Sequence, residues 1–184
     1  MKIVMISGSL RAASSNTALV RALIASAPPG VEAMLYDGLA SLPHFSPELE
    51  ASLPDAVKDL RAELASADGV LICTPEYAFG IPGSLKNALD WLVSSGELWQ
   101  KPVAVLSASP SALGGEKAHA ALSLTLSALE AEVVEAASLH IPFVSTKLNA
   151  AKEVSDPATL AALEASLAAL IAAVEEQARQ GARE

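Results

Sequence analysis

The chain has 184 residues, of which 52% are hydrophobic and 18% are charged. This length is typical of one domain with a substantial core, and the composition excludes an intrinsically disordered chain. The formal net charge of −9 argues against general attraction to nucleic acid or to an anionic membrane surface. A single cysteine excludes an intramolecular disulfide and favours a reducing compartment, so we expect a cytoplasmic protein that binds neither nucleic acid nor membrane.

Short apolar runs alternate with segments of helical period, which predicts a parallel sheet covered on both faces. The run at residues 2–7 is too short for a signal sequence or a membrane span, so we interpret it as the first buried strand. We expect a single doubly wound α/β domain over residues 1–184, and two strand orders are common for such sheets. The remaining predicted strands cover residues 32–37, 69–74, 102–107 and a weaker fifth within 132–141.

Apolar stripes with helical spacing predict five helices between and after these strands. The last helix is expected to begin at Asp156-Pro157, because aspartate is a good helix cap and proline suits the first turn. The tail after Glu175 is expected to fray. The long connection over residues 38–54 has little periodicity, and loops of that length are often functional. The stripes include Leu19, Leu23, Leu60, Leu64, Leu85, Leu89, Leu122, Leu126, Leu163 and Leu170.

The loop after the first strand concentrates hydrogen-bond donors at the start of a predicted helix. A helix N-terminus presents unpaired N–H groups that attract anions, and hydrogen bonds with a charged partner add roughly 1.5–3 kcal/mol each. We therefore expect a phosphate site here; the plainer interpretation is a helix cap beside an exposed arginine. The candidate phosphate-binding residues are Ser9, Arg11, Ser14, Ser15 and Asn16.

The loops after the third and fourth strands are also unusual for plain connections. The loop after the third strand is stiffened by prolines and glycines and carries two aromatic rings. It could support a planar heterocycle, or it could be a tight turn whose rings pack into the core. The second is small and polar, so its backbone can approach a flat ligand. The candidate residues are Pro75, Glu76, Tyr77, Ala78, Phe79 and Gly80 in one loop, and Ser107, Ser109 and Gly114 in the other.

A strand order of 2-1-3-4-5 would gather all three loops at one edge of the sheet, where α/β proteins bind ligands. The dinucleotide alternative is weak, because no Gly-x-Gly-x-x-Gly follows the first strand and Asp37 is the only candidate ribose-binding acid. The Gly-Lys-Ser/Thr sequence that ends a P-loop is also absent from this loop. The hydroxyl-rich loop fits a terminal monophosphate better than a pyrophosphate.

Two stretches resemble the signatures of the NADPH-dependent FMN reductase family: Gly8-Ser9-Leu10-Arg11 followed by Ser14-Ser15-Asn16, and residues 75–91. The resemblance extends from the first strand to the last helix. It implies a flavodoxin-like three-layer sandwich with a five-stranded parallel sheet in the order 2-1-3-4-5. It also implies FMN held at its phosphate by the first loop and along its ring system by residues 75–80. NADPH or NADH would be the hydride donor, and the chain would form a homodimer or homotetramer.

The chain departs from the family pattern at three positions. Relatives often carry Asn where this chain has Ala78, and Ser where it has Gly80, so ring contacts there would come from the backbone. Gly114-Gly115 is followed by Glu116-Lys117 in place of an arginine. Lysine keeps the charge but lacks the two-pronged guanidinium, which bears on nucleotide or subunit contacts more than on FMN.

Other candidate residues have simpler interpretations. Cys73 lies inside a predicted strand and is interpreted as a buried thiol. The three histidines show no metal-ligand spacing, so no metal is expected. An apolar helix face is flanked by Lys86, Asn87, Asp90 and Trp91, which indicate either a solvated surface or a subunit interface. Glu76 could be a general acid, but flavin chemistry needs positioning more than a catalytic side chain, so none is assigned.

The leading hypothesis is an NAD(P)H-dependent FMN oxidoreductase with ping-pong kinetics and a broad set of small-molecule acceptors, such as quinones, free flavin, azo compounds or chromate. One alternative is an FMN-binding electron carrier or sensor without efficient turnover. Another is a protein of the same fold that binds a phosphate ligand other than a flavin.

Overall fold

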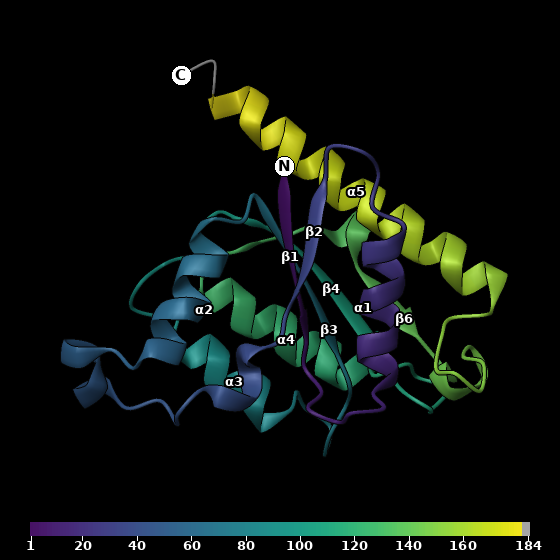
Figure 1. Ribbon diagram of the computed structural model, residues 1–184, viewed down its shortest axis with the longest axis horizontal. Helices are drawn as coiled ribbons and strands as arrows, with labels where there is room; N and C mark the ends of the chain where they lie inside the picture. Colours follow the sequence, from purple (N-terminus) through teal and green to yellow (C-terminus); the bar gives the residue numbers. More distant parts are fainter. Residues whose placement is uncertain (182–184) are drawn as a thin grey trace.

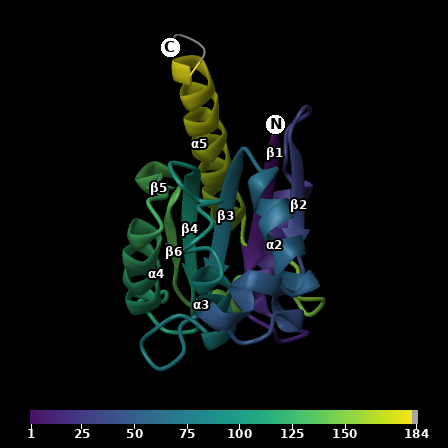
Figure 2. The same cartoon turned by 90° about the vertical axis from the view of Figure 1, so that its left-hand side faces the viewer.

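The computed structural model describes residues 1–181 as one parallel sheet with helices on both faces (Figures 1 and 2). Neighbouring strands follow the order β2-β1-β3-β4-β5, and every pair is parallel. The predicted order and the flavodoxin-like three-layer architecture are therefore confirmed. The strands are β1 (Lys2–Ser7), β2 (Glu32–Tyr36), β3 (Gly69–Thr74), β4 (Pro102–Ala108), β5 (Glu132–Val133) and β6 (Leu139–Ile141).

Helices α1 and α5 cover one face of the sheet, and α2, α3 and α4 cover the other (Figure 2). All five predicted helices are present. Their bounds are α1 (Ser15–Ala25), α2 (Asp55–Ala65), α3 (Gly83–Asp90), α4 (Glu116–Ala128) and α5 (Pro157–Gly181). The described residues also include four short 3₁₀ turns: η1 (Gly38–Ser41), η2 (Pro47–Ser52), η3 (Glu135–Ala137) and η4 (Val144–Thr146).

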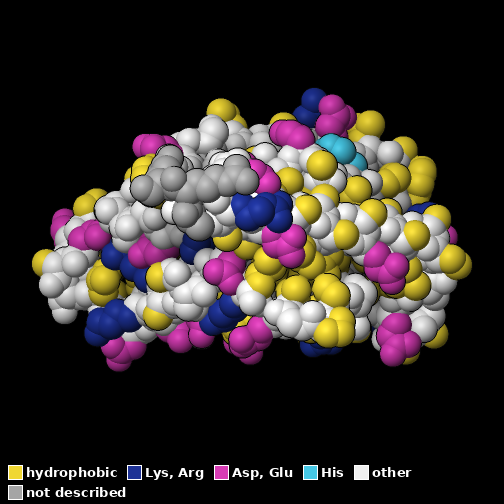
Figure 3. All heavy atoms as spheres, turned by 90° about the horizontal axis from the view of Figure 1, so that it is seen from above, with side chains coloured by type: hydrophobic (Ala, Val, Ile, Leu, Met, Phe, Trp, Pro, Cys, Tyr) yellow, Lys and Arg dark blue, Asp and Glu magenta, His cyan; other side chains and the backbone are white. Residues whose placement is uncertain are grey.

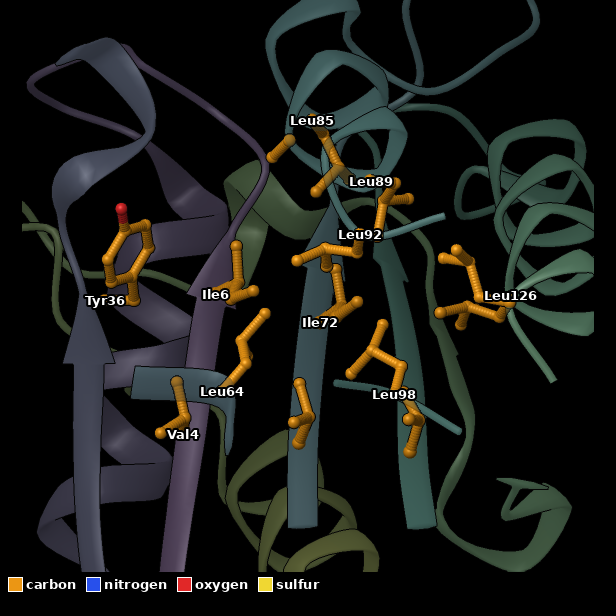
Figure 4. Packing of buried hydrophobic residues seen from close by; sticks show 14 of the residues in the cluster. Val4, Ile6, Tyr36, Leu64, Ile72, Leu85, Leu89, Leu92, Leu98 and Leu126 are labelled. Carbon is orange, nitrogen blue, oxygen red and sulfur yellow. The ribbon is translucent and has the colours of Figure 1, made fainter. Parts of the chain in front are cut away.

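The core has two halves because alternate residues of a strand point to opposite faces. Val4 and Ile6 pack with leucines of α2, α3 and α4, as Figure 4 shows. Ile3, Met5 and Cys73 pack with α1 and α5 on the other side. Burial on both faces explains why the strands are continuous apolar runs rather than alternating ones.

Strand register brings three loops together at one edge. Ser7 at the end of β1 pairs with Cys73 of β3, and Thr74 pairs with Ser107 of β4. The loops that follow β1, β3 and β4 therefore start side by side, at the lower edge of the sheet in Figure 1. This edge holds the candidate site.

The predicted fifth strand is broken into β5 and β6, which both pair with β4. Between them η3 turns towards α5, where Ser166 Oγ donates a hydrogen bond to the carbonyl of Ala137. Ser138 Oγ accepts the hydrogen bond of Val105 N at 3.3 Å, so a hydroxyl replaces the missing strand partner.

Helix α5 begins where the sequence predicts, because Asp156 Oδ2 accepts hydrogen bonds from Thr159 N at 3.0 Å and Thr159 Oγ1 at 2.6 Å. It continues to Gly181, whereas fraying was expected after Glu175. The extra turns are supported by a 2.8 Å ion pair between Arg179 and Glu176.

By length and composition α5 could also cross a membrane, but here its apolar stripe packs into the core on one face of the sheet.

On the face shown in Figure 3, acidic side chains lie among hydrophobic ones. The basic side chains of the described residues form no continuous patch on this face.

The long connection over residues 38–54 folds back onto α3. Trp91 Nε1 and Asn87 Nδ2 both donate to the carbonyl of Pro43 at 3.0 Å, and Phe45 packs edge-on against Trp91 with ring centroids 5.0 Å apart. Trp91 is fully buried. The expectation of a solvated or intersubunit tryptophan is therefore wrong, because its partner lies elsewhere in the same chain.

Candidate functional site

The loop between β1 and α1 is packed tightly against the loop after β3. Gly8 N donates to the carbonyl of Cys73 at 2.9 Å, which extends the strand pairing by one residue. A Cβ on Gly8 would lie 3.0 Å from Leu85 Cδ2 and 3.3 Å from Thr74 Oγ1. A larger residue would push Leu85 or Thr74 aside, so glycine favours the close approach by which the first loop forms one wall of a cleft between the neighbouring loops.

The polar side chains of the first loop are turned inward. Ser9, Ser14 and Asn16 are each at most 8% exposed although they sit in a loop and the first turn of a helix. Ser14 caps α1, and its Oγ accepts the hydrogen bond of Thr17 N at 3.3 Å. Ser14, Ser15 and Asn16 line the cleft, so the N-terminus of α1, which is the positive end of the helix dipole, lies beside it.

Arg11 differs from these residues because its side chain is exposed. Within residues 1–181 the guanidinium makes no hydrogen bond or ion pair. Its backbone is nevertheless held, since Arg11 N donates to Ser9 Oγ and the carbonyl accepts from Ser14 N. A free cation on a fixed backbone at a helix N-terminus can close over an anion bound in the cleft.

Asn16 is held from behind by Cys73 of β3. The thiol donates to Asn16 Oδ1 with an Sγ to Oδ1 distance of 3.2 Å. Full burial raises the pKa of Cys73, so the group remains a thiol and can keep donating. Because the amide oxygen of Asn16 is taken, its NH₂ group is the donor left for a ligand. The interpretation of Cys73 as a buried structural thiol agrees with this geometry.

The loop after β3 ends in a tight turn. Tyr77 and Gly80 exchange backbone hydrogen bonds at 2.9 and 3.0 Å. Between them Ala78 and Phe79 have φ values of 49° and 61°, as a type I′ turn requires. Such angles cost a residue with a side chain roughly 1–2 kcal/mol. The turn carries its rings outward, since Tyr77 is 47% and Phe79 is 81% exposed.

Glu76 connects this turn to helix α4. Its Oε2 accepts hydrogen bonds from Lys117 N at 2.9 Å and Ala118 N at 3.2 Å, so the carboxylate caps the first turn of α4. This arrangement gives Glu76 a positioning role and leaves its backbone for a ligand. Lys117 contributes its backbone N–H to this contact.

The predicted residues in and before the loop after β4 divide between the cleft and the packing behind it. Ser109 Oγ faces the cleft and hydrogen bonds with Ser111. Ser107 is fully buried and its Oγ lies 3.0 Å from His140 Nδ1. A Cβ on Gly114, which has φ of 59°, would lie 2.9 Å from Pro142 N, so this position requires glycine for backbone packing.

A histidine pair supports that loop. The rings of His119 on α4 and His140 on β6 lie 4.1 Å apart between centroids. Burial, together with the neighbouring His140, lowers the pKa of His119 to about 4, so its ring is neutral at physiological pH. No group of three His, Cys, Asp or Glu residues that could hold a metal occurs in residues 1–181.

The three loops enclose a cleft of about 170 Å³. Nine of the predicted site residues line it: Ser9, Arg11, Ser14, Ser15, Asn16, Pro75, Glu76, Tyr77 and Ser109. Ala78, Phe79 and Gly80 belong to the exposed turn beside it, whereas Ser107 and Gly114 are buried behind it. The cleft thus has an arginine, several hydroxyls and a helix N-terminus on one side and an aromatic ring on another.

The sequence interpretation missed a fourth wall that comes from the segment after β6. Phe143 N and Val144 N donate to the carbonyls of Ser111 and Ser109, which brings Val144 and Ser145 into the cleft. Lys152, from the turn before α5, adds a second cation. The only sequence signal was a long aperiodic stretch after a strand of a parallel sheet, which is where ligand-binding loops occur.

Comparison with known proteins identifies the family. The family model for NADPH-dependent FMN reductase matches residues 1–146. A quinone reductase from Escherichia coli K12 is 33% identical over 174 residues, which cover 92% of this chain and 93% of the relative. An NAD(P)H-dependent FMN reductase from Pseudomonas aeruginosa is 37% identical over 129 residues, covering 68% of this chain and 69% of the relative.

A solved structure agrees with these matches. The flavoenzyme NAD(P)H:(acceptor) oxidoreductase FerB from Paracoccus denitrificans superposes with a TM-score of 0.86 at 29% identity, over 95% of this chain and 97% of that one. The family, the fold and the polar cleft at the carboxyl edge of the sheet agree with one another. The chain is therefore an oxidoreductase of the NADPH-dependent FMN reductase family, whose chemistry uses FMN and NAD(P)H.

Proposed function

We propose that this chain holds FMN with its phosphate in the cleft at the start of α1 and reduces quinone-type acceptors with electrons from NAD(P)H. The observation that carries the proposal is the contrast within one site. Buried donors and a free guanidinium face a small cleft, and an exposed aromatic turn lies directly beside it. FMN has the matching division into an anionic phosphate and a flat, largely apolar ring system.

The cleft suits a phosphate group and the adjoining chain. Its volume of about 170 Å³ lies below the ~300–1,000 Å³ typical of pockets that enclose a whole ligand. The donors available are the N–H groups of the first turn of α1, the hydroxyls of Ser9, Ser14 and Ser15, and the NH₂ group of Asn16. Arg11 and Lys152 supply local positive charge against the overall −9.

The ring system must then lie outside the cleft. We assign it to the turn Tyr77–Gly80 and to the loop of Ser109, where backbone groups and apolar side chains are exposed. When bound there, FMN would supply the redox chemistry, which is hydride acceptance from reduced nicotinamide and electron delivery to an acceptor. The residues of this chain orient it, and none of them has to transfer a proton in this scheme.

Quinones are the acceptors we favour. The relative from E. coli is a quinone reductase, and a quinone needs a flat apolar surface that solvent-exposed rings such as Tyr77 can offer. An open face with few directional contacts would accept several substrates in turn. We therefore expect ping-pong kinetics and activity with a broad set of small electron acceptors.

We also propose that the chain works as a homodimer or homotetramer in the cytoplasm. Exposed apolar side chains gather on the loops around the cleft, among them Leu10, Phe79, Leu113 and Phe143, each more than half exposed. A second copy would cover this surface and narrow the approach to the flavin. Isolated exposed hydrophobic residues are ordinary, but several around one cleft are typical of an interface.

The test is a spectrum of the purified protein followed by turnover. We expect a yellow protein, or uptake of added FMN by a colourless one, with bleaching by NADPH or NADH under anaerobic conditions and rapid reoxidation by benzoquinone. A protein that takes up no FMN would contradict the proposal. Tight FMN binding with negligible consumption of NADPH and NADH in the presence of quinone would instead indicate an electron carrier or sensor.

A further inference from the structure

A second and larger hollow lies between helices α1 and α5, which stand side by side in Figure 1. Its volume is about 650 Å³, within the range of pockets that hold small organic ligands. The exposed side of α1 forms one wall, the first turns of α5 form another, and the turn over residues 151–154 closes the end nearest the phosphate cleft. We call this hollow the α1–α5 groove.

The groove is continuous with the phosphate cleft. Ala13, Ser14 and Lys152 line both hollows, so they meet at the first turn of α1. A phosphate bound at Ser14 would therefore sit at the junction between them. In FMN that phosphate is the end of the molecule, whereas in FAD it carries a second phosphate and an adenosine.

The side chains of the groove match such an extension. Arg21 and Lys152 line it, and neither side chain has an ion-pair partner within residues 1–181. Glu153 and Glu164 are also present, and carboxylates are the usual partners of ribose hydroxyls in nucleotide sites. Small or apolar residues fill the remaining wall and leave room for a flat base: Ala18, Ala22, Ala25, Val154 and Leu160.

We propose that the α1–α5 groove is an adenylate subsite, so that this chain binds FAD as well as FMN. The proposal rests on the proposed function, because the flavin phosphate must occupy the cleft at Ser14. In FAD bound this way the second phosphate would pass Lys152 at the junction, with Arg21 further along the groove, and the adenosine would extend along the alanines of α1. Arg21 and Lys152 would offset the negative charge of the second phosphate.

The test is calorimetric titration of flavin-free protein with FMN and with FAD. We expect the wild-type chain to bind FAD with a dissociation constant within about threefold of that for FMN, or tighter. Ala25→Trp fills the groove from an exposed position of α1, so we expect it to weaken FAD binding about tenfold or more and FMN binding less than about twofold. Arg21→Glu should weaken FAD binding in the same selective way.

Ala168→Trp is the matched control, because Ala168 is an exposed alanine of α5 outside the groove. FMN binding in each variant also reports that the variant is folded. Wild-type binding of FAD about tenfold or more weaker than FMN would overturn the proposal, and so would FAD binding that is insensitive to Ala25→Trp. Conversion of an oligomer to a monomer by Ala25→Trp would assign the groove to a second copy instead. If wild-type protein fails to bind FMN, the proposed function itself is contradicted.

Discussion

The two loops that meet at the candidate site are built on opposite principles. In the loop between β1 and α1 the polar side chains are buried and already hydrogen bonded, as for Ser14 and Asn16. In the turn after β3 the side chains of Tyr77 and Phe79 are exposed, and the turn itself is closed by backbone hydrogen bonds between Tyr77 and Gly80. One loop has a fixed set of donors, whereas the other has a fixed shape.

This difference explains how one site can be selective and permissive at once. Donors that are fixed before binding lose little entropy when an anion arrives, so the first loop selects its ligand strongly. Contacts with an exposed apolar turn require no hydrogen bonds in fixed directions, so the turn can contact different flat molecules of suitable size. We therefore expect substitutions in the first loop to change cofactor affinity, and substitutions in the turn to change stability or acceptor choice.

The largest expected effect comes from the first loop. Arg11→Ala removes the guanidinium from the phosphate cleft, and we expect FMN to bind roughly 10- to 100-fold more weakly, because charge-assisted hydrogen bonds of about 1.5–3 kcal/mol are lost. Titration of the flavin-free protein with FMN measures this. Arg11→Lys should lose only part of the affinity, since it keeps the charge.

Arg21→Ala is the control for this prediction, because Arg21 is an exposed arginine of the adjoining helix α1 that does not line the phosphate cleft. It should leave FMN affinity unchanged. Equal FMN affinities for wild type and Arg11→Ala would remove the first loop from the cofactor site and erase the contrast between the two loops.

A smaller effect is expected where the turn is tied to α4. Glu76→Ala leaves Lys117 N and Ala118 N without their acceptor, so we expect the free energy of unfolding to fall by about 1 kcal/mol, as for loss of a helix cap. Urea denaturation measures the change. FMN affinity should fall less than in Arg11→Ala, because the side chain positions the turn and does not reach the phosphate.

Glu116→Ala is the matched control, because Glu116 is also acidic and in the first turn of α4 but makes no side-chain hydrogen bond within residues 1–181. It should cost less stability than Glu76→Ala. If both variants unfold alike, Glu76 contributes only its charge near the helix dipole and does not connect the turn to α4.

Much of this site could be predicted from the sequence, since parallel strands place their following loops at one edge. Ser14, Asn16 and Tyr77 line the cleft as expected because strand periodicity located those loops correctly. Lys152 was missed because it lies in the irregular segment between β6 and α5, which folds back to the cleft. Local sequence patterns do not predict where such a segment packs.

Trp91 illustrates the same limit. On a helix with an apolar face, a tryptophan at the edge of the stripe predicts an exposed or intersubunit position. In the folded chain Pro43 and Phe45 cover it from a connection more than 40 residues away. The break in the fifth strand is a related case, because a single hydroxyl, that of Ser138, replaces a backbone partner in the sheet.

The smallest expected effect concerns the strain stored in the turn. Ala78 is exposed and has φ of 49°, in the left-handed region where asparagine is several-fold enriched. Alanine holds this left-handed conformation at a cost that the paired backbone hydrogen bonds of Tyr77 and Gly80 offset. Ala78→Asn should therefore raise the free energy of unfolding by about 0.5–1 kcal/mol, and Ala78→Val should lower it, because a β-branched side chain tolerates these angles poorly. Urea denaturation of both variants measures this. The control is Ala112→Asn, at an exposed position, which should not raise the free energy of unfolding.

Opposite shifts for the two Ala78 variants, with FMN affinity unchanged, would establish that this region supplies shape rather than binding groups. Equal shifts would mean that the turn relaxes away from the left-handed conformation, so the rigid surface that the acceptor site needs would have to come from another part of the chain.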